Sequence, residues 1–170
     1  PFVVPDGSTE ELLQYVEGLM QVRPNGDDMA SAMEYRKNMG RTLVTVGDRI
    51  LAKTPADEQA QEAAVLILNG LNALESTGDN DAKQRLQGLP AEFKKAGLPK
   101  LVRITENFTL QGRLQGARGM PPEEIKKLIG DVEAYAAGGP VQGEDVNLIM
   151  TAGMMAEDAP EDIAALLQAL

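Results

Sequence analysis

The chain has 170 residues and a formal net charge of −10, and it contains no cysteine, histidine or tryptophan. Without cysteine and histidine there is no thiolate nucleophile, no disulfide, no thiolate metal site and no side chain that titrates near neutrality unperturbed. The acidic balance disfavours a nucleic-acid or anionic-membrane surface spread over the molecule, because phosphate neutralisation requires clustered Lys and Arg.

The first two predicted elements are helices with clear starting signals. Ser8 and Glu11 match the S-x-x-E capping box, in which each side chain satisfies a free backbone donor of the other residue. Asp27 or Asp28 can cap a long second helix. Apolar residues at helical spacing follow in both: Leu12, Leu13, Tyr15, Val16, Leu19 and Met20, then Met29, Met33, Gly40, Leu43, Val46 and Ile50.

Prolines and glycines divide the middle of the chain. Pro55 suits the first turn of a third helix, because the amide hydrogen that proline lacks would be unpaired there. Gly78 ends this helix. Asp79-Asn80-Asp81 opens a fourth helix, and we expect Pro90 to interrupt or restart it.

Four further helices are predicted towards the end of the sequence. A fifth follows Gly97 and Pro99, a sixth begins at Pro121-Pro122, and a seventh runs from about Glu144. Pro160 starts an eighth. Its apolar stripe has the spacing of a buried helix face and consists of Ile163, Leu166, Leu167 and Leu170.

The pattern predicts an all-α protein with about seven or eight helices. Short connections favour antiparallel hairpins, arranged as an irregular bundle or as a short solenoid similar to tetratricopeptide repeats, although the Trp, Gly, Tyr and Pro pattern of those repeats is missing. We expect residues 1–170 to form one domain of a longer chain, because the last apolar stripe is still running at Leu170; a natural terminus is the alternative.

Several glycines lie inside predicted helices, where each costs about 1 kcal/mol relative to alanine. Gly40, Gly47, Gly70 and Gly130 are therefore expected to mark close helix crossings.

The chain has 8 methionines. Met29, Met33, Met150 and Met154 lie on apolar stripes, so ordinary core filling is the preferred interpretation. An adaptable groove for partner helices is the alternative, since thioether side chains repack easily.

Charge is segmented along the chain. Residues 1–81, 82–118 and 119–170 carry net charges of −8, +6 and −8. One hypothesis is that the basic middle docks an acidic protein partner, with Lys94, Lys95, Lys100 and Arg103 as the candidate patch. The alternative is that the basic middle packs beside its own acidic flanks.

No catalytic, cofactor or metal residue is predicted. Asp79-Asn80-Asp81 lacks the glycine and glutamate of a calcium loop, and the acidic residues on either side of Pro160 have the placement of first-turn helix caps. An enzyme that relies on paired carboxylates is a third alternative, and the spacing favours no pair.

The opening residues 1–19, PFVVPDGSTEELLQYVEGL, carry a family resemblance. They are similar to the start of the helical region that precedes the thioredoxin-like domain in planctomycete-type TlpA-like thiol-disulfide oxidoreductases. The specific part is the wording PF-x-VP-[DE]-G-[ST]-x-EELL. A helix ending near Ile50-Leu51-Ala52 and another opening at Pro55 extend the likeness in layout.

The resemblance implies an exported, periplasmic or membrane-tethered parent whose redox chemistry lies in a downstream Cys-x-x-Cys motif. No catalytic residue carries over, because this chain has no cysteine. It would then be a non-catalytic accessory or interaction domain that contacts a protein partner or the downstream thioredoxin-like domain. The alternative is a stand-alone helical-repeat scaffold that binds a protein or peptide.

Overall fold

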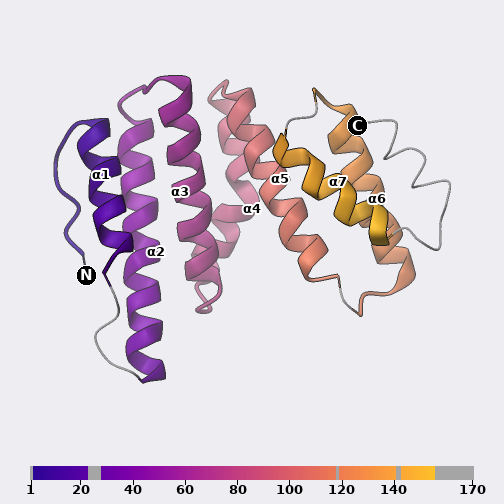
Figure 1. Ribbon diagram of the computed structural model, residues 1–170, viewed down its shortest axis with the longest axis horizontal. Helices are drawn as coiled ribbons and strands as arrows, with labels where there is room; N and C mark the ends of the chain where they lie inside the picture. Colours follow the sequence, from indigo (N-terminus) through magenta and orange to yellow (C-terminus); the bar gives the residue numbers. More distant parts are fainter. Residues whose placement is uncertain (1, 23–27, 118, 141–142, 156–170) are drawn as a thin grey trace. The chain divides into compact units, whose positions relative to one another are not determined.

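The computed structural model describes residues 2–22, 28–117, 119–140 and 143–155. These residues form seven α-helices and contain no strand, which confirms the predicted all-α class (Figure 1). The predicted eighth helix from Pro160 lies outside the described residues. The helices are α1 (Thr9–Met20), α2 (Met29–Leu51), α3 (Asp57–Glu75), α4 (Asn80–Lys95), α5 (Pro99–Gln115), α6 (Pro122–Ala137) and α7 (Gly143–Met155).

The chain divides into two compact units, Pro1–Thr105 and Glu106–Leu170, with the boundary inside α5. Each unit is therefore described by itself. The expectation that residues 1–170 form a single domain stays a prediction.

In the first unit, helices that follow one another in the chain lie side by side. α1 packs on α2, α2 on α3 and α3 on α4. Apolar faces of the first three helices meet in a core made of Leu12, Val16, Leu43, Val46, Ile50, Ala63 and Leu66.

Side-chain caps fix where three helices begin. The Glu11 carboxylate accepts the Ser8 amide at 2.7 Å, and the Ser8 hydroxyl accepts the Glu11 amide at 3.2 Å, which confirms the capping box. Asp28 caps α2 by accepting the Ser31 amide at 2.9 Å, and hydrogen bonds from Ser31 hold the pKa of Asp28 below its ordinary value. Asp79 caps α4.

Two proline predictions were wrong. Pro55 precedes α3 and is not in its first turn, because Ala56 is the extended N-cap residue and the helix starts at Asp57. Pro90 lies inside α4 and neither interrupts nor restarts it. Proline removes one backbone hydrogen bond, and the buried Leu89 and Phe93 hold the helix in place on both sides of it.

Glycines mark a close crossing of α2 and α3. A Cβ atom built on Gly40 would lie 2.8 Å from the Gly70 carbonyl oxygen, and one on Gly70 would lie 2.6 Å from the Gly40 carbonyl oxygen. One built on Gly47 would lie 2.7 Å from the Ala63 oxygen. The expectation is confirmed at these three glycines. It was wrong at Gly130, where nothing lies within 4 Å, so this glycine is not at a helix crossing.

In the second unit, the later part of α5 packs with α6 and α7. The pairing of α6 with α7 closes this core. Its buried side chains are Leu110, Leu114, Ala117, Leu128, Ile129, Val132, Tyr135, Ala136, Leu148, Ile149 and Ala152.

Candidate functional site

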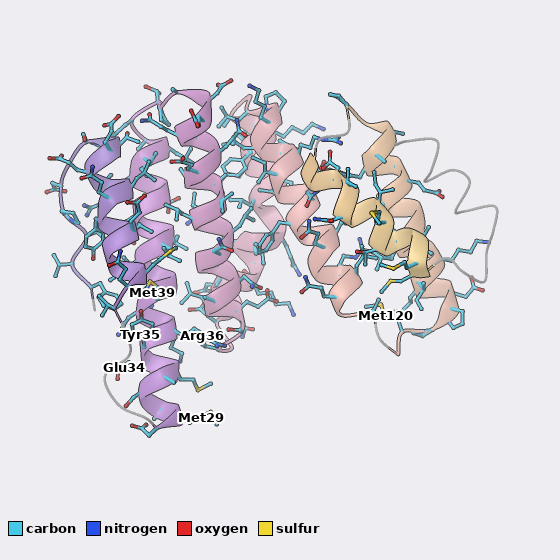
Figure 2. The ribbon with its side chains drawn as sticks, viewed as in Figure 1. Met29, Glu34, Tyr35, Arg36, Met39 and Met120 are labelled. Atoms are coloured by element: carbon cyan, nitrogen blue, oxygen red, sulfur yellow. The ribbon has the colours of Figure 1, made fainter. Side chains whose placement is uncertain are left out.

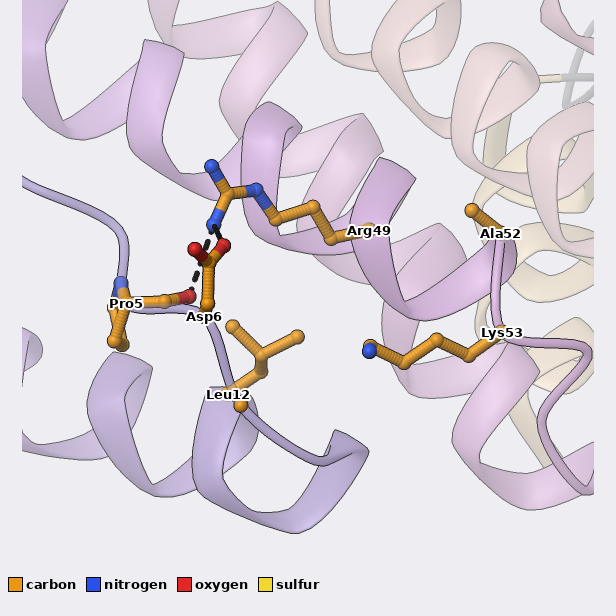
Figure 3. A pocket seen from close by; sticks show the side chains of 7 residues that line it. Pro5, Asp6, Leu12, Arg49, Ala52 and Lys53 are labelled. Atoms are coloured by element: carbon orange, nitrogen blue, oxygen red, sulfur yellow. Dashed lines mark hydrogen bonds and ion pairs between the residues drawn. The ribbon is translucent and has the colours of Figure 1, made fainter.

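A hollow of about 360 Å³ lies where the segment before α1 meets the end of α2 (Figure 3). The Arg49 guanidinium donates to the Val4 carbonyl at 3.2 Å, to the Pro5 carbonyl at 2.9 Å and to the Asp6 carboxylate at 3.0 Å. The Asp6 side chain is fully exposed, so its ion pair contributes little, and the two carbonyl bonds do the positioning. The lining residues are Pro5, Asp6, Gly7, Leu12, Arg49, Ala52 and Lys53.

The hollow explains the residues that carry the family resemblance. Pro5 and Asp6 are held by Arg49, and a Cβ atom built on Gly7 would lie 2.8 Å from the Glu11 carboxylate that closes the capping box. The motif therefore anchors the chain onto α1 and α2. Its observed role is structural.

The four residues of the predicted basic patch differ in their surroundings. Lys94 and Lys95 are exposed in the last turn of α4, where cations complement the helix dipole. Lys100 donates to the Asp57 carboxylate at 2.6 Å, and Arg103 is half-buried. Two of the four cations are thus held within the fold, and docking of an acidic partner stays a prediction.

Other cations of the basic middle pair with the acidic flanks of the same chain. Arg85 of α4 makes a two-pronged contact with Asp48 of α2, at 2.6 and 2.9 Å, and this hydrogen bonding raises the pKa of Arg85. Arg113 of α5 pairs with Asp131 of α6 at 2.7 Å. These contacts support the alternative interpretation for Arg85 and Arg113, as the Asp57 contact does for Lys100.

A buried polar cluster joins three helices of the second unit. The Tyr135 hydroxyl donates to the Asp145 carboxylate at 2.5 Å, the Asn107 amide donates to the same oxygen at 2.9 Å, and Gln111 donates to the Asn107 oxygen at 2.8 Å. Tyr135, Asn107 and Asp145 are all buried. The sequence interpretation missed this cluster. A polar residue between apolar helix positions, as at Asn107, was the only signal for it.

The predicted absence of metal ligands concerns two acidic stretches. Asp79 caps α4, as expected for the first stretch. The acidic residues around Pro160 lie outside the described residues. Within the described part of the chain, no group of three or more acidic side chains is placed to hold a metal ion.

Four methionines assigned to the core lie on the surface instead. Met29 and Met33 of α2 are 81% and 47% exposed, and Met150 and Met154 of α7 are 56% and 64% exposed. Figure 2 shows Met29 at the tip of α2. The core-filling interpretation was therefore wrong, because helical spacing identifies a face of a helix but does not supply a neighbour to cover it.

Comparison with protein-family models, with curated proteins and with solved structures gave no match to this chain. No helix in the described residues combines the length and the apolar character needed to cross a bilayer.

Proposed function

We propose that this chain is a non-catalytic helical interaction module of an exported TlpA-like thiol-disulfide oxidoreductase whose redox domain is not in the chain. The resemblance of residues 1–19 supports the parent and its extracytoplasmic location, periplasmic or membrane-tethered. The exposed methionines support the interaction role.

The observation that carries the interaction role is a methionine pair in each unit. Met29 and Met33 are four residues apart on α2, and Met150 and Met154 are four residues apart on α7, so each pair shares one helix face. Single exposed apolar residues are ordinary, whereas paired large ones form a patch suited to a partner. Methionine fits such a role because its side chain adapts to different partner surfaces.

A stand-alone helical scaffold is the second candidate. It is favoured by the packing of α1 to α4 in chain order, which is the arrangement of stacked hairpins. In this candidate the exposed Lys94 and Lys95 would help to bind an acidic peptide.

Reading the native frame on both sides of the sequence separates the two candidates. A signal or anchor segment before Pro1 and a Cys-x-x-Cys in a β-α-β pattern after Leu170 are expected for the proposed parent. A stop codon directly after Leu170 would refute the proposed parent and favour the scaffold.

The interaction role is tested by affinity capture from extracts of the native cells. The parent chain is compared with a Met150→Glu, Met154→Glu variant and with a Lys94→Glu, Lys95→Glu variant. Loss of a captured protein in one variant but not in the other is expected. Identical capture by all three chains would refute a role for these surfaces.

A further inference from the structure

The N-terminal end of α2 extends past the helix that packs against it. α2 has 23 residues and α3 has 19. The two helices cross closely at Gly40 and Gly70, and the Arg36 guanidinium reaches the Ser76 hydroxyl, at the C-cap of α3, at 3.5 Å. α3 therefore ends level with Arg36, and the two turns of α2 before Arg36 have no α3 residue beside them (Figure 1).

The exposed methionines continue the face of α2 that packs on α3. Met33 lies seven residues before Gly40, and Gly40 lies seven residues before Gly47, so these three share one helix face. Met29 is one turn further along this face. The small residues Ala30 and Ala32 flank it and leave room for a second helix to approach closely. The uncovered turns are thus a continuation of an established helix–helix interface.

We propose that this end of α2, residues 29–37, docks against the same segment of a second copy of the chain, with the two helices antiparallel. The inference rests on the proposed interaction role and names the partner of one methionine pair. In this arrangement the methionines of one copy cover those of the other, which is the self-complementary contact of a two-fold dimer.

Charge complementarity favours a second copy in the antiparallel orientation. The exposed Glu34 is followed by the exposed Arg36 and Lys37. An antiparallel pair that crosses near Met33 brings Glu34 of each copy towards Arg36 and Lys37 of the other. A parallel pair in register would place like charges opposite each other, which is unfavourable.

The first test is the oligomeric state, measured by analytical ultracentrifugation over a range of protein concentrations. We expect the parent chain to form dimers, and a Met29→Glu, Met33→Glu variant to weaken dimerisation at least about tenfold. The matched control is Met150→Glu, Met154→Glu, which changes an equally exposed pair and should leave the dimer intact. Circular dichroism confirms that each variant is folded. A parent that is monomeric at every concentration, or a dimer insensitive to the α2 changes, overturns the proposal.

The second test is disulfide cross-linking, which is clean because the chain has no cysteine of its own. A Met33→Cys variant is expected to form a disulfide-linked dimer under mild oxidation. Val65→Cys, on a side chain 44% exposed, should not. Equal cross-linking at both positions would show random collision and contradict the proposal.

The third test addresses orientation. Glu34→Lys and Arg36→Glu are each expected to weaken the dimer, and the double swap is expected to restore it, because it exchanges the charges of an antiparallel pair. Absence of rescue contradicts the antiparallel contact. Failure of all three tests with continued methionine-dependent capture of another protein would refute this inference and leave the proposed function standing.

Discussion

The crossing of α2 and α3 predicts that Gly70→Ala destabilises the chain although alanine is the better helix former. In an open helix interior this change is worth about 1 kcal/mol in favour of alanine. At Gly70 the new Cβ atom would lie 2.6 Å from the Gly40 carbonyl oxygen and 2.8 Å from a Val44 methyl carbon. The carbonyl oxygen belongs to the backbone, so the helices must separate.

Overpacking of this kind costs about 1–3 kcal/mol, and the bad contact with a backbone atom puts Gly70→Ala at the upper end. After subtraction of the helix-forming gain, we expect a net loss of about 1–2 kcal/mol. For a chain of this length that lowers the melting temperature by about 2–8 °C. Thermal and denaturant unfolding are followed by far-UV circular dichroism, since there is no tryptophan. Gly70→Leu should be worse.

The matched control is Gly88→Ala in the same unit. Gly88 is exposed inside α4, and a Cβ atom there would meet nothing within 4 Å. This variant should be as stable as the parent or up to about 1 kcal/mol more stable. A Gly70→Ala or Gly70→Leu variant that melts at or above the parent would refute the reasoning.

Three further predictions concern single contacts. Thr54 has a φ of 49°, which is costly for a β-branched residue, so Thr54→Gly should raise the melting temperature by an amount equivalent to about 1 kcal/mol, and no gain would argue against strain there. Asp48→Asn should lower the free energy of unfolding by about 1 kcal/mol in urea titrations, because Arg85 loses its charged partner at a site that is partly screened by solvent; an unchanged midpoint would contradict this. The Asp28 cap stabilises α2 as the carboxylate. Its pKa is lowered by Ser31, so the stability lost in Asp28→Ala should be largest near neutral pH and disappear as pH falls below about 4; a pH-independent difference in melting temperature would count against it.

Local signals in the sequence predicted the helices well. The bonds of the capping box join Ser8 to Glu11, three residues away, so the four letters contain the whole interaction. Gly40, Gly47 and Gly70 predicted a crossing because glycine inside a helix needs a compensating contact. The same argument failed at Gly130, since an exposed glycine can be tolerated without one.

Features that depend on distant residues could not be predicted in this way. The methionine stripe of α2 gave a correct helix face, but only the length of α3 determines that Met29 and Met33 stay uncovered. The cluster of Asn107, Tyr135 and Asp145 joins residues 10 to 38 positions apart on three helices, and no spacing rule brings them together.

The anchoring of the opening segment has a consequence for the order of folding. The capping box closes over three residues and can form as soon as α1 does. The bonds from Arg49 to Val4, Pro5 and Asp6 close over 43 to 45 residues. Closing such a loop costs chain entropy that local contacts do not. The stretch that looks like a single motif in the sequence is thus assembled in two stages, and its second stage waits for α1 and α2 to pair.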